Sequence, residues 1–251
     1  MLKKFLSRIG IGAAEVNLEL SQNVFTMGDL VTGRIKIIGG EVEQKIGDIS
    51  VDLLVESVYA KDEHTFKLKD VVARTVITNG MLIYPGQRLE FPFTFKIPEN
   101  IPVSMINTKY YFKTNLDIKE ALDSSDYDYI KIMPSGILKN FLGAFEELGF
   151  IPRKESYTGE YQIIDFYPMS WLAGQLDELT FCYNPRRANY EISGKFEIDK
   201  RNHGLIGFLA DELDLDEKKG YFCFTANELA TLEKARETIK NFIARNFNSL
   251  I

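Results

Sequence analysis

The sequence predicts a mainly β protein made of two tandem antiparallel β-sandwich domains, and three observations support this prediction. Many short segments alternate between apolar and polar residues, which is typical of strands with one buried face. Aromatic residues make up 12% of the chain, including 18 Phe and 12 Tyr, and strands favour these types. No helical pattern separates the strands between residues 13 and 134, so we expect hairpin connections rather than a parallel sheet.

The domain boundaries follow from where this alternation begins and ends. We expect an amphipathic helix over 1–12, a first sandwich over 13–134, a linking helix over 135–154, a second and smaller sandwich over 155–225, and a C-terminal helix over 226–251. The expected strands lie near 15–20, 31–37, 48–59, 64–78, 88–97, 108–118 and 127–133, and then near 158–167, 176–183, 188–199 and 220–225. Pro92 lacks an amide hydrogen, which places the strand over 88–97 at a sheet edge or at a bulge.

The first helix has an apolar face and a basic face within residues 2–9. The residues that would make outside contacts are Leu2, Lys3, Lys4, Phe5, Leu6, Arg8 and Ile9. A helix this short does not hold alone in water, so it must dock on something. The first sandwich, a partner groove and an anionic membrane are all open as its target.

The linking helix and the C-terminal helix have their own boundary signals. Ser135 is a suitable N-cap for the linking helix, Gly149 follows its end, and Pro152 stops any continuation. Thr225 and Glu228 form a capping box before the C-terminal helix. Its apolar stripe consists of Leu229, Leu232, Ile239, Phe242, Ile243 and Phe247. The stripe either packs on its own domain or forms an interface with another protein or a second copy.

Composition and motifs argue against several classes of function. The net charge of −6 argues against nucleic acid as a partner. The two cysteines, Cys182 and Cys223, form no CxxC, and both histidines, His64 and His203, lie in expected surface loops. The sequence contains no Walker A loop, HExxH or GxSxG motif. We therefore expect no catalytic residues, no metal and no cofactor, and without a signal peptide or an apolar span we expect a cytoplasmic location.

Five stretches carry a resemblance to a known family. They are 24–35 (VFTMGDLVTGRI), 38–46 (IGGEVEQKI), 108–134 (TKYYFKTNLDIKEALDSSDYDYIKIMP), 176–181 (LDELTF) and 204–212 (GLIGFLADE). In this order they resemble the bacterial sporulation-control protein family, whose members have an arrestin-like fold. Met27 stands where the family's turn usually carries proline.

The resemblance implies two tandem arrestin-like sandwiches, no known catalytic activity, and control of sporulation or cell development through contacts with other proteins. A peripheral membrane or lipid-associated regulator that uses residues 2–9 is the alternative. The expected partners are other proteins, including a second copy, with weak anionic membrane contact at most.

An acidic cluster has three open interpretations. Asp117, Asp123, Asp126 and Asp128 lie close together in the sequence. They form a solvated loop, or they supply oxygen ligands to calcium, or they contribute to a latch. Arrestins bury acids and an arginine that hold their domains together, and the resemblance implies such a latch here between Arg34 or Arg74 and Asp117, Asp126 or Asp128.

Overall fold

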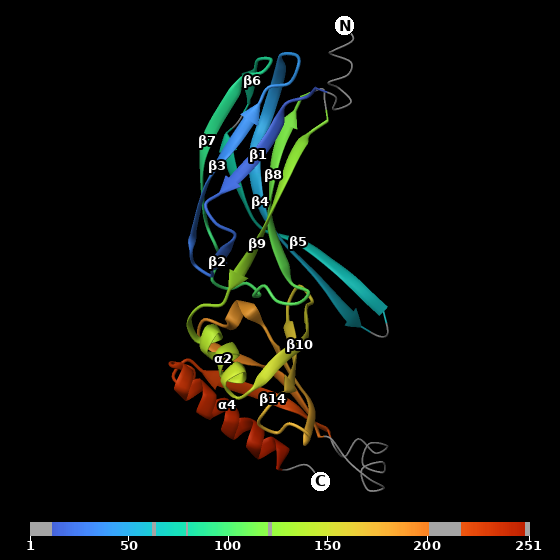
Figure 1. Ribbon diagram of the computed structural model, residues 1–251, viewed down its shortest axis with the longest axis vertical. Helices are drawn as coiled ribbons and strands as arrows, with labels where there is room; N and C mark the ends of the chain where they lie inside the picture. Colours follow the sequence, from blue (N-terminus) through green and yellow to red (C-terminus); the bar gives the residue numbers. More distant parts are fainter. Residues whose placement is uncertain (1–11, 62–63, 79, 120–121, 201–216, 249–251) are drawn as a thin grey trace. The chain divides into compact units, whose positions relative to one another are not determined.

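The computed structural model describes residues 12–61, 64–78, 80–119, 122–200 and 217–248 (Figure 1). The chain is mainly β and divides into two compact units. Unit 1 takes the residues up to 56 together with 69–97 and 109–132, and unit 2 takes 57–68, 98–108 and the residues from 133 on. The expected boundaries differ from this, because 135–154 and two earlier segments belong to unit 2.

Unit 1 contains two antiparallel sheets. The smaller is three-stranded, in the order β1-β3-β7, with β1 at Glu15–Leu20, β3 at Leu30–Ile38 and β7 at Arg88–Lys96. The larger has the order β2-β9-β8-β4-β5, with β6 paired to β4. Its strands are β2 (Val24–Thr26), β4 (Gln44–Lys61), β5 (His64–Thr78), β6 (Met81–Ile83), β8 (Lys109–Ile118) and β9 (Ser124–Met133). The end of β4 from residue 57, the start of β5 up to residue 68, and Met133 are assigned to unit 2.

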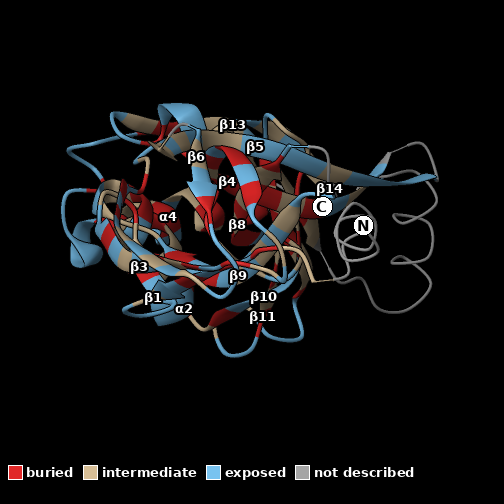
Figure 2. Ribbon diagram, turned by 90° about the horizontal axis from the view of Figure 1, so that it is seen from above, coloured by how far each residue is buried: buried red, intermediate tan, exposed pale blue. Residues whose placement is uncertain are grey.

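Aromatic side chains join the two sheets of unit 1 face to face. The ring of Phe112 on β8 lies 5.5 Å from Phe93 and 5.2 Å from Phe95, both on β7. Buried residues gather along β4 and β8 (Figure 2). The prediction of an edge strand at Pro92 is confirmed, because β7 is the last strand of its sheet. The seven expected strands are present, and the short β2 and β6 are additional.

Unit 2 contains one five-stranded antiparallel sheet whose strands follow chain order, β10-β11-β12-β13-β14. The strands are β10 (Phe150–Tyr157), β11 (Gln162–Pro168), β12 (Leu176–Tyr183), β13 (Glu191–Lys200) and β14 (Glu217–Thr225), with the 3₁₀ helix η1 at Pro185–Arg187. Helices α2 (Gly136–Glu147) and α4 (Leu232–Phe247) pack on one face of this sheet. The expected second sandwich is therefore replaced, among the described residues, by one sheet with two helices against it.

The aromatic core explains why helices cover this sheet. Phe141 of α2 lies 5.9 Å from Phe181 and 6.2 Å from Phe222. Phe242 of α4 lies 5.2 Å from Phe224 and 4.8 Å from Phe196. The apolar faces of both helices and the inner face of the sheet thus bury one another, and this layer arrangement needs no second sheet.

Two boundaries near the helices differ from the predictions. Instead of one strand at 158–167, the chain forms β10 immediately after α2 and then β11. Pro152 is accommodated because β10 is an edge strand. The capping-box contact between Thr225 Oγ1 and Glu228 Oε2 is present at 2.7 Å, but α4 begins only at Leu232, where Thr231 accepts a hydrogen bond from the Lys234 amide.

Some predictions concern residues that the structure does not describe. The contact helix at 2–9 lies outside the described residues, as does the stretch around 204–213. Within the described parts, no helix is both long enough and apolar enough to cross a membrane.

Candidate functional site

A buried carboxylate lies at the centre of a polar cluster in unit 2. Glu155 on β10 is 2% exposed. Its Oε2 accepts from the backbone amides of Asn107 and Thr108, each at 3.0 Å. Its Oε1 accepts from the Thr108 hydroxyl at 2.5 Å and from Gln162 Nε2 at 2.8 Å. Because an unpaired buried charge is very costly, this set of donors is what allows a carboxylate to occupy the position.

Gln162 extends this cluster to a second part of the same segment. Its amide exchanges two hydrogen bonds with the backbone of Val103, at 3.0 and 3.1 Å. The Tyr183 hydroxyl donates to Gln162 Oε1 at 2.8 Å, and burial raises the pKa of Tyr183. The cluster therefore fixes segment 98–108, which connects β7 to β8, onto β10–β12 of unit 2. This is an ionic anchor that sequence reasoning missed.

The predicted latch arginines have other partners. Arg74 on β5 donates to both oxygens of Asp52, at 2.5 and 2.9 Å. Asp52 is only 4% exposed on β4, although the Arg74 side chain is 60% exposed. Arg34 lies 4.0 Å from Glu90, and both side chains are well exposed. The bidentate pair is thus formed by Asp52, which was not among the predicted acids, and it lies within unit 1.

The three predicted acids lie apart from those arginines. Asp117 pairs with Lys119 at 3.2 Å on the surface. Asp126 Oδ2 accepts from the Leu18 amide at 2.8 Å, so it caps the free edge of β1. Asp128 Oδ2 is buried and has no hydrogen-bond partner among the described atoms. Burial, and then the negative charge of Asp126, raises the pKa of Asp128 to about 7.

The calcium interpretation also has no support from the arrangement. The fourth acid, Asp123, accepts from the Ile118 amide at 3.1 Å. Across the described residues, no group of three or more His, Cys, Asp or Glu side chains is placed to hold a metal ion.

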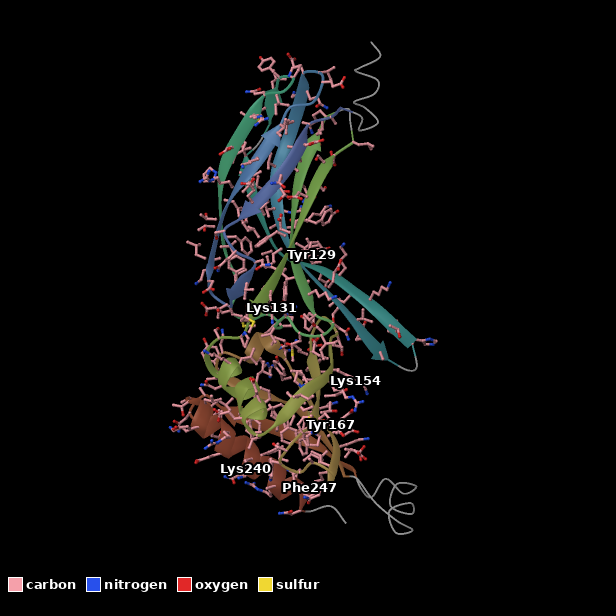
Figure 3. The ribbon with its side chains drawn as sticks, viewed as in Figure 1. Tyr129, Lys131, Lys154, Tyr167, Lys240 and Phe247 are labelled. Atoms are coloured by element: carbon pink, nitrogen blue, oxygen red, sulfur yellow. The ribbon has the colours of Figure 1, made fainter. Side chains whose placement is uncertain are left out.

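A group of tyrosines stands on the outer face of the larger sheet in unit 1. Tyr111 on β8 lies 5.1 Å from Tyr129 and 5.8 Å from Tyr127, both on β9 (Figure 3). Tyr111 donates to Glu56 at 2.9 Å, and Lys69 lies 3.2 Å from the same carboxylate. Lys113 lies over the Tyr127 ring at 5.9 Å. We call this surface the tyrosine face; it comprises Lys69, Lys109, Tyr111, Lys113, Tyr127, Tyr129 and Lys131.

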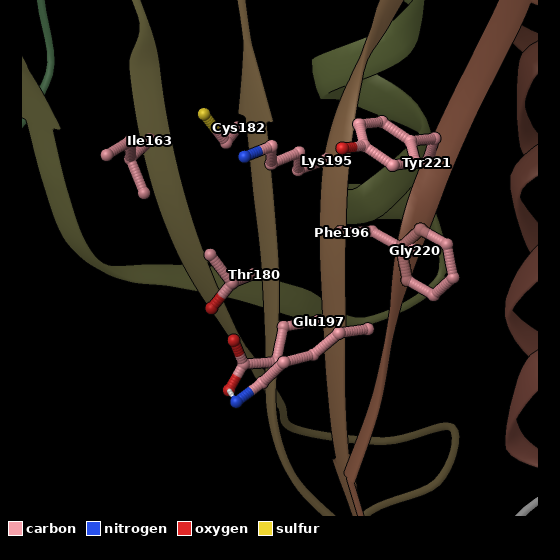
Figure 4. Close-up of a pocket in the computed structure, with 9 residues that line it drawn as sticks. Ile163, Thr180, Cys182, Lys195, Phe196, Glu197, Gly220 and Tyr221 are labelled. Carbon is pink, nitrogen blue, oxygen red and sulfur yellow. Dashed lines mark ion pairs between the residues drawn. The ribbon is translucent and has the colours of Figure 1, made fainter.

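A shallow hollow of about 520 Å³ lies on the outer face of the unit 2 sheet (Figure 4). Its lining includes Ile163, Cys182, Lys195, Glu197, Lys219 and Tyr221. Lys219 pairs with Glu197 at 3.5 Å. Burial raises the pKa of the Cys182 thiol, which disfavours the nucleophilic thiolate form. The Cys182 thiol is therefore disfavoured as a nucleophile, although the nearby Lys195 acts in the opposite direction on its pKa.

The predicted interface stripe of the C-terminal helix is largely covered by unit 2 itself. Leu229, Ile239 and Ile243 are 0% exposed and Phe247 is 8% exposed. Phe242 is half-buried among the rings of β13 and β14. Leu232, at 36%, is the most exposed residue of the stripe. The stripe is thus largely core, which agrees with the first of the two alternatives, packing on its own domain, because the inner face of the single sheet needs this cover.

Comparison with known proteins gives consistent results along the chain. A family model described as SpoOM protein matches residues 2–202. The sporulation-control protein spo0M of Bacillus subtilis (strain 168) is 30% identical over an alignment of 251 positions, which covers 96% of this chain and 96% of that protein. The crystal structure of Spo0M, a sporulation control protein from Bacillus subtilis, matches with a TM-score of 0.75 and 26% identity. That match covers 94% of this chain and 100% of the other.

Proposed function

The chain belongs to the SpoOM protein family, and on this basis we propose that it is a regulator in the control of sporulation or cell development that acts through contacts with other proteins. The observation that carries this proposal is the similarity to the Bacillus subtilis sporulation-control protein over 96% of both chains. We infer a cytoplasmic protein without catalytic activity, in which surfaces of an arrestin-like scaffold do the work.

Two features support action through surfaces. The polar groups buried in unit 2 are engaged in holding segment 98–108, which is a structural task. The hollow on the unit 2 sheet is shallow and is partly lined by an ion pair. The tyrosine face, in contrast, presents aromatic rings to solvent, and exposed aromatic residues are enriched at protein interfaces.

The proposal is tested by crosslinking the tagged full chain in cells of its source and identifying the proteins that are recovered. A chain of the same tag and similar size serves as the control. We expect a small set of proteins to be enriched reproducibly, with regulators of sporulation or cell development among them. Recovery of nothing beyond the control would contradict the proposal.

A second candidate function rests on the amphipathic pattern at residues 2–9. Lys3, Lys4 and Arg8 would each contribute about 1 kcal/mol near an anionic bilayer, so a peripheral membrane regulator would bind weakly and reversibly. Flotation with anionic liposomes tests this candidate, using the full chain and a chain that begins at Ala13. Equal flotation of the two chains, or none at any salt concentration, would remove it.

A further inference from the structure

The tyrosine face is rigid although it is exposed. Tyr111 is 1% exposed, whereas its neighbours Tyr127 and Tyr129 are 50% and 61% exposed. The buried ring is fixed by its hydrogen bond to Glu56, and the two outer rings rest against it. Aromatic rings that are already held in place lose little conformational freedom when a partner binds. The arrangement is therefore that of a preformed contact surface.

The tyrosine face is basic, although the whole protein carries a net charge of −6. Alternate residues of a strand share a face, so Lys109 and Lys113 accompany Tyr111, and Lys131 accompanies Tyr129. Lys69 and Arg74 already have carboxylate partners in Glu56 and Asp52. In the part of the chain that the structure describes, Lys109, Lys113 and Lys131 have no carboxylate partner within ion-pair distance.

We propose that the tyrosine face binds an acidic segment of a partner protein. Carboxylates of the segment pair with Lys109, Lys113 and Lys131, and its apolar side chains lie on the rings of Tyr127 and Tyr129. This inference rests on the proposed function, because it assigns that function's contacts to one surface. An acidic segment is favoured over a nucleic acid because the net negative charge of the protein repels a dense polyanion.

The binding test uses an acidic copolymer of glutamate and tyrosine, labelled with a fluorophore and followed by fluorescence anisotropy. A lysine–tyrosine copolymer of the same length is the charge-reversed probe. We expect the full chain to bind the acidic probe with an affinity that falls as salt rises. Binding of the basic probe, which a chain of net charge −6 attracts at its acidic surfaces, should be the same in the variants below as in the wild type. No salt-sensitive binding of the acidic probe would overturn the proposal.

The chain offers a closely matched control pair. Lys195 lies over the Tyr221 ring at 5.9 Å on unit 2, the same separation as between Lys113 and Tyr127, and Tyr221 is 79% exposed. The test variant is Lys113→Gln with Tyr127→Ala, and the control is Lys195→Gln with Tyr221→Ala. We expect the test variant to lose about tenfold in affinity for the acidic probe, one factor of ten being about 1.4 kcal/mol, and the control to lose none.

The test variant Lys113→Gln with Tyr127→Ala also removes ring contacts. A second variant, Lys113→Gln with Lys131→Gln, is therefore tested beside it. These changes remove charge and leave the cluster of rings intact. If neither variant weakens binding, or if the unit 2 control weakens it equally, the face is not the binding surface. Tighter binding of single-stranded DNA or of phosphatidylglycerol vesicles, lost in the same variants, would overturn the assignment of the occupant.

Cellular crosslinking separates failure of this inference from failure of the proposed function. Partners recovered by the wild-type chain and lost by the Lys113→Gln, Lys131→Gln variant support both. If both chains recover the same partners, the function stands and the tyrosine face is excluded. If the wild-type chain recovers none, the proposed function itself fails.

Discussion

Each unit has a cluster of aromatic rings, but the cluster is exposed to solvent in unit 1 and buried in unit 2. In unit 1, Tyr127 and Tyr129 stand on the outer face of a sheet and are 50% and 61% exposed. In unit 2, the aromatic rings of the sheet face α2 and α4, so that Phe141 and Phe181 are 0% exposed. The residue types differ accordingly. The exposed rings are tyrosines, which carry a hydroxyl that water can solvate, and the buried rings are phenylalanines, which carry none.

This difference shows why an apolar stripe on a helix is weak evidence for an interface. The stripe of α4 is longer and more apolar than anything on the tyrosine face, yet its own sheet covers it. A contact surface is indicated by apolar and aromatic side chains that stay exposed after the sheets and helices of the unit have packed together. The α4 stripe should therefore contribute to stability and the tyrosine face to binding.

The largest effect is expected from Phe242→Ala on α4. Its ring packs among Phe196, Phe222 and Phe224, so truncation should lower the free energy of unfolding of unit 2 by about 3–5 kcal/mol. Urea unfolding followed by fluorescence of Trp171, which is the one Trp of the sequence and lies in unit 2, measures this. Leu232→Ala should cost far less. An unchanged midpoint for Phe242→Ala would mean that α4 is not a cover for the sheet.

A smaller loss is expected when the buried anchor of unit 2 is altered. Glu155→Gln places an amide where Asn107 and Thr108 donate, which leaves buried donors unpaired at about 1–3 kcal/mol. The control Glu178→Gln changes an acid of the same sheet whose side chain is 38% exposed and lies 3.7 Å from Lys154, and it should stay within about 0.5 kcal/mol of the wild type. Urea unfolding followed by Trp171 fluorescence measures the free energy of unfolding of both variants. Equal losses would show that segment 98–108 is not held by this carboxylate.

The pH dependence of unit 1 is expected to come from Asp128. Its pKa is raised to about 7 by burial and then by Asp126, so the folded state holds this proton more tightly than the unfolded state does. The resulting stability is fully present below the ordinary Asp pKa of about 4 and is lost as pH rises through about 7.

Hydrogen exchange of the β1 amides, corrected for intrinsic rates, measures this loss of stability between pH 5 and 8. Protection of the Leu18 amide, which donates to Asp126, should fall with rising pH in the wild type and stay level in Asp128→Asn. The control Asp117→Asn removes an exposed acid paired with Lys119 and should follow the wild type. A level profile in the wild type would contradict the role given to Asp128.

The smallest stability effect is expected on the tyrosine face. Tyr127→Ala with Tyr129→Ala removes two cross-strand ring contacts with Tyr111, which are worth about 0.2–1 kcal/mol each. The midpoint of thermal unfolding should therefore move little compared with Phe242→Ala. A loss as large as that of Phe242→Ala would mean that the tyrosines are structural and that the comparison between the units fails.

Much of the fold could be predicted from the sequence, because its strands alternate. The predicted bounds of 64–78 and 176–183 coincide with β5 and β12, since each run is bounded by turn residues. The single sheet of unit 2 could not be predicted, because strand alternation shows that one face is covered and does not show whether helices or strands cover it. The sequence therefore leaves open whether the α4 stripe packs on its own unit or forms an interface, and the sheet of unit 2 covers it.

The candidate sites were harder to predict than the fold. Asp52 carried a usable signal, since it is an acid inside the apolar run 49–55, and a buried acid needs a basic partner such as Arg74. Glu155 carried none, because two of its donors, the backbone amides of Asn107 and Thr108, lie 48 and 47 residues away. The tyrosine face depends on the register that places Tyr111 opposite Tyr129, and register between strands is not visible in sequence alone.

Site-specific photocrosslinking in cells tests most directly the claim that this protein works through an exposed surface of unit 1. Benzoylphenylalanine is placed at Tyr129 in one chain and at Leu232, the most exposed residue of the α4 stripe, in another. We predict a crosslinked protein adduct from position 129 and none from position 232. An adduct from position 232 alone would contradict the account and would restore the C-terminal helix as the interface.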